Sequence, residues 1–220
     1  MRTRHIVLLI VVVSIALVLV LVPTGRRDVE RSPDDYPWLI DVNAAGETRV
    51  LGITLGRSSL ADAEQRFGSS AAVVLFAATD NGLSLEAFFN EVTLGGLSSR
   101  IILNLSVPPE VLAQMRERGG AGERTESGAV RHRLHVDDLA KARAASIWAL
   151  TYVPYVQLKA DLIEERFGRA TEVVRTSKQT VHLLYPNKGL DIMVNDDERE
   201  VLQFVRPADF ERLRAKLVRQ

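Results

Sequence analysis

A metal site is the first chemistry to test against the sequence, because the segment 130–138 reads VRHRLHVDD, with two histidines followed by two aspartates. Imidazole and carboxylate groups are common metal ligands. However, apolar and polar residues alternate here, which predicts a strand, and on a strand His132 and His135 point to opposite faces. We interpret both histidines as surface residues, and either Asp137 or Asp138 as the N-cap of the following helix.

The serines and the other histidines do not have the spacing of a hydrolase site. The serine pairs at 58–59 and 98–99 lack the glycine-framed strand–turn–helix that exposes a nucleophilic serine. His5 and His182 are far apart in the sequence and supply no obvious base for any serine. We therefore predict no catalytic residue.

An acidic turn at 196–200 reads DDERE and is the one other cluster of ligand-type residues. It lacks the glycine of a regular calcium loop, and Arg199 interrupts the carboxylates. The sequence predicts a solvated turn here, with no metal site and no cofactor.

Aromatic residues give the only lead toward function. Aromatic side chains on an exposed sheet face are common anchors of protein interfaces. The alternative for each of them is packing in the core. The candidate interface residues are Phe88, Phe89, Trp148, Tyr152 and Tyr155.

A short internal repeat organises the chain around these residues. The sequence EQRFG at 64–68 recurs as EERFG at 164–168. Apolar residues upstream of each copy share one helix face, which predicts two helices that end at the repeated phenylalanine. The closing glycines, Gly68 and Gly168, stand where a helix C-cap favours a left-handed backbone. The apolar faces are Leu60, Ala63 and Phe67 in the first copy, and Val156, Ala160, Ile163 and Phe167 in the second.

A strand followed by a proline also occurs twice. In the first copy Leu103, Leu105 and Val107 alternate before Pro108, and in the second a similar strand precedes Pro207. Proline is favoured in the first turn of a helix, so each strand is predicted to lead into one. Further strands, separated by turn signals, are predicted at 73–77, 83–93, 172–176, 180–185 and 190–194. Each unit thus reads helix, antiparallel meander, helix.

An apolar run at the N-terminus predicts a membrane anchor. Residues 6–22 read IVLLIVVVSIALVLVLV, which is apolar on every face and about long enough to span a bilayer as a helix. A cleaved signal peptide is the competing interpretation, but the run ends without the small-residue pattern of a cleavage site. The short N-terminal flank places the following domain outside the cytoplasm.

Composition excludes several classes of function. The 28 basic residues balance the 28 acidic ones, so no net charge attracts nucleic acid. The chain has no cysteine, which excludes disulfides, thiolate nucleophiles and a lipidation cysteine.

The helix-and-meander pattern is similar to a known family. The segments 53–68 and 167–205, each with a Phe-Gly pair at a helix end, resemble the module of β-lactamase inhibitor proteins and of small envelope lipoproteins of outer-membrane assembly. The resemblance covers most of 50–118 and 150–217. It implies a non-catalytic protein whose antiparallel sheet, backed by helices, is presented to a protein partner. This chain departs from the pattern because it lacks the lipidated cysteine and disulfides, and because a helix follows each meander.

The sequence therefore predicts an α+β protein, with an N-terminal transmembrane helix followed by two repeated α-β-meander-α units whose antiparallel sheet is backed by helices. The expected boundaries are a membrane anchor at 1–25, a tether at 26–37, a first repeat at 38–118, a linker at 119–129 and a second repeat at 130–220.

The expected location is a bacterial cytoplasmic membrane, with residues 6–22 in the bilayer and the C-terminal domain outside the cytoplasm. We expect a non-catalytic protein-binding or scaffolding module whose partner is another envelope protein and not nucleic acid. The alternatives are an envelope hydrolase or a small-ligand sensor with a site between the two units.

Overall fold

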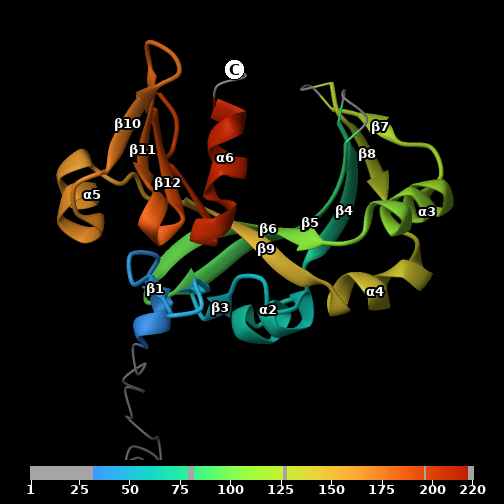
Figure 1. Cartoon of the computed structure of the whole chain (residues 1–220). Coiled ribbons are helices and arrows are strands. Elements are labelled where there is room, and N and C mark those ends of the chain that lie inside the picture. The colour runs from blue at the N-terminus through green and yellow to red at the C-terminus, as the bar shows by residue number, and fades with distance from the viewer. Residues whose placement is uncertain (1–31, 79–81, 126–127, 196, 218–220) are drawn as a thin grey trace, which may run out of the picture. The chain divides into compact units, whose positions relative to one another are not determined.

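The computed structural model describes residues 32–78, 82–125, 128–195 and 197–217. The membrane anchor predicted at 1–25 lies outside these residues. Within them, no helix is both long enough and apolar enough to cross a membrane. Residues 33–220 form one unit, an α+β structure with a large and a small antiparallel sheet (Figure 1).

The large sheet has ten strands in the order β10-β11-β12-β13-β9-β6-β5-β4-β8-β7, and the small one has the order β1-β2-β3. Both sheets are antiparallel throughout, so the predicted meanders join into one continuous layer. The strands are β1 (Asp41–Val42), β2 (Thr48–Val50), β3 (Ile53–Thr54), β4 (Ala72–Ala77), β5 (Leu83–Leu94), β6 (Leu97–Ser106), β7 (Glu123–Arg124), β8 (Val130–Arg133), β9 (Ser146–Pro154), β10 (Glu172–Arg175), β11 (Thr180–Tyr185), β12 (Leu190–Asn195) and β13 (Val201–Val205).

Five short α-helices and several 3-10 turns connect these strands in the described residues. The α-helices are α2 (Leu60–Phe67), α3 (Pro109–Gly119), α4 (Leu139–Ala144), α5 (Ala160–Phe167) and α6 (Phe210–Leu217). The 3-10 turns are η1 (Pro33–Asp35), η2 (Val136–Asp138), η3 (Pro186–Lys188) and η4 (Pro207–Asp209).

The two faces of the large sheet are covered differently. On one face, α2, α3, α4, α5 and the small sheet bury one large core, which includes Leu103 and Leu150 from the middle of the sheet. On the other face, Phe210 and Leu213 of α6 pack on Ala149 and neighbouring residues in a smaller cluster. The ends of the sheet, at β4 and β8 and at β10 to β12, turn toward the side of α6 (Figure 1). We call this side the concave face.

The two repeated helices form where the sequence predicts them but end differently. Ser59 caps α2 with a complete capping box to Asp62, and Gly68 closes it in the left-handed conformation, at φ 68° and ψ 19°. Gly168 follows α5 with a positive φ of 80°, as a C-cap glycine is expected to, but its ψ of −176° is extended and differs from that of Gly68. The second helix also begins four residues later than predicted, at Ala160, and leaves Val156 exposed.

The five further strands that the sequence predicts are confirmed as β4, β5, β10, β11 and β12, and their ends lie within a residue or two of the predicted ones. The expected linker at 119–129 contributes β7, which pairs with β8. Folded structure begins earlier than Trp38, because Arg66 of α2 holds η1 through the Asp35 carboxylate at 2.7 Å and the Asp34 carbonyl at 3.0 Å. The predicted tether therefore includes residues that pack on the domain.

Candidate functional site

Four apolar side chains gather on the concave face without joining either core cluster. They are Val74 and Phe76 from β4, Phe88 from β5 and Ile102 from β6, and each is half-buried. Phe88 pairs directly with Ile102 across the strands, and the rings of Phe76 and Phe88 meet edge-on with centroids 6.0 Å apart. We call these four side chains the open patch.

The open patch exists because these strands are apolar on both faces. Its residues alternate with Leu75, Ala87, Ile101 and Leu103, which are buried beneath the helices of the opposite face. A sheet with one face in solvent normally alternates apolar and polar residues. Here the alternation is lost although, among the described residues, α6 is the only helix packed on the concave face. Apolar side chains on an uncovered face are typical of a contact surface.

A polar row crosses the sheet beside the open patch. Val74 pairs with Glu86, Glu86 pairs with Asn104, and Asn104 pairs with Ala149 on β9. The Asn104 amide donates to Glu86 Oε1 at 3.2 Å, and the Ser84 hydroxyl donates to the same oxygen at 3.3 Å. Glu86 is therefore held in place by its neighbours on the sheet.

Arginines surround the open patch. Arg131 and Arg133 of β8 pair directly with Phe76 and Val74, and Arg100 precedes Ile102 by two residues on the same face of β6. Arg131 forms an ion pair with Glu123. Across the sheet on α6, the Arg212 guanidinium lies 4.2 Å from the ring centre of Trp148.

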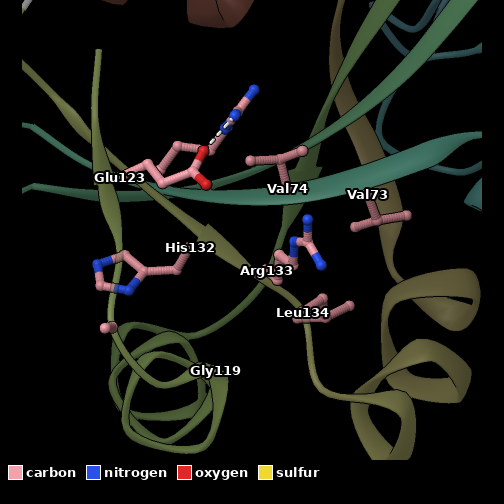
Figure 2. Close-up of a pocket in the computed structure, with 9 residues that line it drawn as sticks. Val73, Val74, Gly119, Glu123, His132, Arg133 and Leu134 are labelled. Atoms are coloured by element: carbon pink, nitrogen blue, oxygen red, sulfur yellow. Dashed lines mark hydrogen bonds and ion pairs between the residues drawn. The ribbon is translucent and has the colours of Figure 1, made fainter.

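Three hollows border this surface. The first, of about 450 Å³, lies at the β4–β8 edge, where Val74, Glu123 and Arg133 line it together with the backbone of Gly119 (Figure 2). The second, of about 330 Å³, lies beside Trp148 and Arg212. The third, of about 650 Å³, is lined by residues around Arg100 and Tyr155. The surface is thus uneven, with room for side chains of a bound partner.

The predicted interface aromatics divide between the two faces. Phe88 lies in the open patch and Trp148 lies on the same face beside α6. Tyr155 is half-buried beneath Arg199, and its hydroxyl donates to the Asn90 carbonyl.

Phe89 and Tyr152 do not belong to an accessible surface. Each is 2% exposed in the large core, on the side covered by helices. Phe89 packs against Phe67 with ring centroids 5.1 Å apart, and burial raises the pKa of the Tyr152 phenol. The interface assignment for these two residues is therefore corrected: strand alternation points them away from Phe88 and Thr151, their neighbours in sequence.

His132 and His135 each contact the nearby backbone. His132 Nδ1 lies 3.1 Å from the Gly120 carbonyl, and His135 Nδ1 accepts from the backbone N–H of Asp137 at 3.3 Å. In the described part of the chain no three ligand-type residues are grouped to hold a metal ion. Asp138 stands at the N-cap position of α4, as the sequence predicts, but its side chain makes no capping hydrogen bond.

The carboxylate of Asp138 instead binds Arg118 of α3, at 2.6 and 2.9 Å, and is 1% exposed. The hydrogen bonds from Arg118 hold the pKa of Asp138 below its ordinary value, and the opposing effect of burial is smaller. A carboxylate with a depressed pKa contributes stability that is complete above its unfolded pKa, about 4, and is lost as the pH falls through the folded value.

We expect the Asp138→Asn variant to lose less stability between about pH 6 and about pH 3 than the wild type, because the amide cannot titrate. Urea unfolding monitored by circular dichroism at the two pH values measures this difference. An equal loss in both proteins would show that the Arg118–Asp138 contact does not contribute to acid sensitivity.

A buried histidine–aspartate pair was missed from the sequence. His182 of β11 and Asp191 of β12 lie on the concave face beside Leu184, which packs with α6. They are 4% and 1% exposed, and His182 Nδ1 lies 2.9 and 3.1 Å from the two carboxylate oxygens. His182 Nε2 is buried and has no hydrogen-bond partner in the part of the chain that the structure describes. The hairpin register around the turn at 186–189 could have revealed the pair. It pairs His182 with Met193 and Leu184 with Asp191, which places His182 and Asp191 on the same face of neighbouring strands.

The acidic turn also differs from its prediction at one position. Glu200 is 2% exposed, and its carboxylate accepts the backbone N–H of Leu158 at 2.9 Å. Glu200 therefore fixes the entry to α5, while Asp197 and Glu198 are exposed as the sequence predicts.

Comparison of this chain with family models, with curated proteins and with solved structures finds no match. The class of protein must therefore be argued from the fold and from the concave face alone.

Proposed function

We propose that this chain is a non-catalytic protein-binding module, and that it binds its partner through the concave face of the large sheet. The observation that carries the proposal is the open patch, in which four apolar side chains lie on an uncovered face of strands whose other face is already buried. Aromatic and aliphatic anchors of this kind dominate the energetics of protein interfaces. Burial of the patch by a partner would remove these side chains from water.

Support for a binding role over an enzymatic one comes from where the titratable groups lie. The histidine–aspartate pair, His182 and Asp191, is buried and lines none of the three hollows described above. A substrate would have to reach these groups to use them in acid–base chemistry. The open patch, by contrast, is half-buried, and its residue Val74 lines the hollow at the β4–β8 edge.

The location of the module follows from the N-terminal sequence. Residues 6–22 anchor the chain in a bacterial cytoplasmic membrane, and the domain lies outside the cytoplasm. The partner is then another protein of the cell envelope. The family similarity of the helix-and-meander pattern agrees with this role, since members of that family present a sheet to a protein.

The two-repeat organisation also belongs to this proposal. β6 and β13 flank β9 on its two sides, and Leu103 and Phe204 both pair with Leu150. Each strand is followed by a proline and a helix, and each half contains one of the EQRFG-type helices. These correspondences support descent of both halves from one α-meander-α unit.

The experiment is quantitative affinity capture of the full-length chain from membranes of its native host, with mass spectrometry of what co-purifies. We expect Phe88→Ser and Ile102→Ser to reduce recovery of the main partner at least about tenfold, because each removes an apolar anchor from the interface. The matched control is Val136→Ser, which changes a side chain that is 68% exposed on η2. Equal recovery with all three variants would refute the proposed surface.

A further inference from the structure

We infer that the partner presents an extended segment of about six residues, apolar in its middle and acidic at both ends, which lies across the strands of the concave face. The inference rests on the proposed function and adds to it the charge and the shape of what is bound. It follows from the positions of the unpaired charges around the open patch.

The arginines that border the open patch outnumber the carboxylates beside them, because Arg131 and Arg133 share the single charge of Glu123. Arg100, Arg133 and Arg212 are exposed, and in the described part of the chain none of them forms an ion pair with a carboxylate. Arg131, the fourth, is paired with Glu123. An exposed arginine beside an apolar surface is a ready partner for a carboxylate, which its planar guanidinium can bind with two hydrogen bonds.

Three carboxylates of the same face are already engaged. Glu86 accepts hydrogen bonds from Asn104 and Ser84. Farther along the sheet, Asp191 is paired with His182, and Glu172 with Arg214. Asp197 and Glu198 line the hollow that contains Arg100, so the remaining positive charge lies near Arg133 and Arg212. Electrostatic complementarity at these two positions favours an acidic partner.

The register sets the length and direction of the bound segment. One cross-strand row runs from Arg133 on β8 through Val74, Glu86 and Asn104 to Ala149 on β9, beside Trp148 and Arg212. Five strands span about 19 Å at roughly 4.8 Å per step, a distance that an extended chain covers with about six residues. Carboxylates at the two ends of such a segment reach Arg133 and Arg212. Its path passes over Glu86 and Asn104, with Phe76 on one side and Phe88 and Ile102 on the other, so its apolar side chains contact the open patch by turning to either side of the polar row.

The shape of the face favours a peptide segment over a lipid surface. The ends of the sheet turn toward the side of the open patch, and α6 stands on the same side (Figure 1). A flat anionic bilayer cannot follow a concave surface, whereas an extended chain can lie in it.

The test is selection of peptides from a phage-displayed random twelve-residue library on the full-length chain, held in nanodiscs of neutral phosphatidylcholine. We expect the selected peptides to carry acidic residues about five positions apart on either side of apolar ones. Their affinity should fall at least about tenfold with Arg133→Glu or Arg212→Glu, and should fall further as salt is raised, since the attraction is between exposed charges. The control Arg169→Glu, at a side chain that is 92% exposed away from this face, should leave affinity unchanged.

Three results would overturn the inference, and they separate it from the proposed function. Selected peptides that depend on Phe88 but are not acidic, or that tolerate both arginine reversals, would leave the binding face standing and refute the acidic segment. Selection of no peptide sensitive to Phe88→Ser would count against both. Binding of phosphatidylserine vesicles that is lost on Arg133→Glu, with no peptide selected, would assign the arginines to lipid.

Discussion

Replacing Gly189 with alanine is expected to destabilise the domain by more than about 3 kcal/mol. Gly189 joins η3 to β12 with φ at 63° and ψ at 34°, and a β-carbon at this position would lie 1.9 Å from the carbonyl oxygen of Val205. The same segments are linked by a hydrogen bond of 2.8 Å from the N–H of Val205 to the carbonyl of Gly189. The new methyl group must therefore push β13 away from the hairpin in the centre of the second half.

Gly68→Ala is the matched control, because Gly68 has a similar backbone at φ 68° and ψ 19° but a β-carbon there meets no atom within 4 Å. We expect it to cost only about 1 kcal/mol, the conformational penalty of a left-handed alanine. Equilibrium unfolding in urea measures both variants. A cost for Gly189→Ala no larger than that of Gly68→Ala would show that the close approach to Val205 is not a constraint on the fold.

Asp191→Ala is expected to cost about 3 kcal/mol or more, because it removes the only partner that a buried imidazole has among the described residues. Both ring nitrogens of His182 would then be buried without a hydrogen bond, since Nε2 already has none. We expect the destabilisation to be largest where α6 packs on the sheet. Amide hydrogen exchange should therefore become faster in α6 than in the core strands β6 and β9.

Two further variants separate this effect from a general loss of charge. Glu123→Ala removes a carboxylate from an exposed ion pair with Arg131 and should cost less than about 1 kcal/mol. The double variant His182→Leu with Asp191→Leu replaces the polar pair with apolar groups, and should lie within about 1 kcal/mol of the wild type. If the double variant were as unstable as Asp191→Ala, packing and not the unpaired imidazole would explain the loss.

The parts of the fold that follow local rules could be predicted from the sequence. Ser59 and Gly68 mark the two ends of α2, and Pro108 precedes α3, because caps and prolines act within a few residues of their position. The strands β4, β5 and β11 follow from apolar runs bounded by turn residues. Each of these signals needs no knowledge of the distant chain.

The parts that depend on long-range pairing could not be predicted. β9 lies between β6 and β13, and nothing in its own sequence states that both are its neighbours. The separation of Phe88 from Phe89 follows from strand alternation, but which of the two meets the helices is set by where α2 packs. The residues around Glu200 in the sequence predict a solvated side chain. It is buried instead, where its carboxylate accepts the N–H of Leu158, forty-two positions earlier.

The most direct test of the proposed binding face is photocrosslinking in membranes of the native host, with a photoreactive phenylalanine analogue at position 88 or 102 of the full-length chain. The same analogue at Val136, an exposed residue outside the concave face, is the control. The account predicts that positions 88 and 102 crosslink to one and the same protein, and that position 136 does not. No crosslink from either patch position, or the same crosslink from position 136, would contradict it.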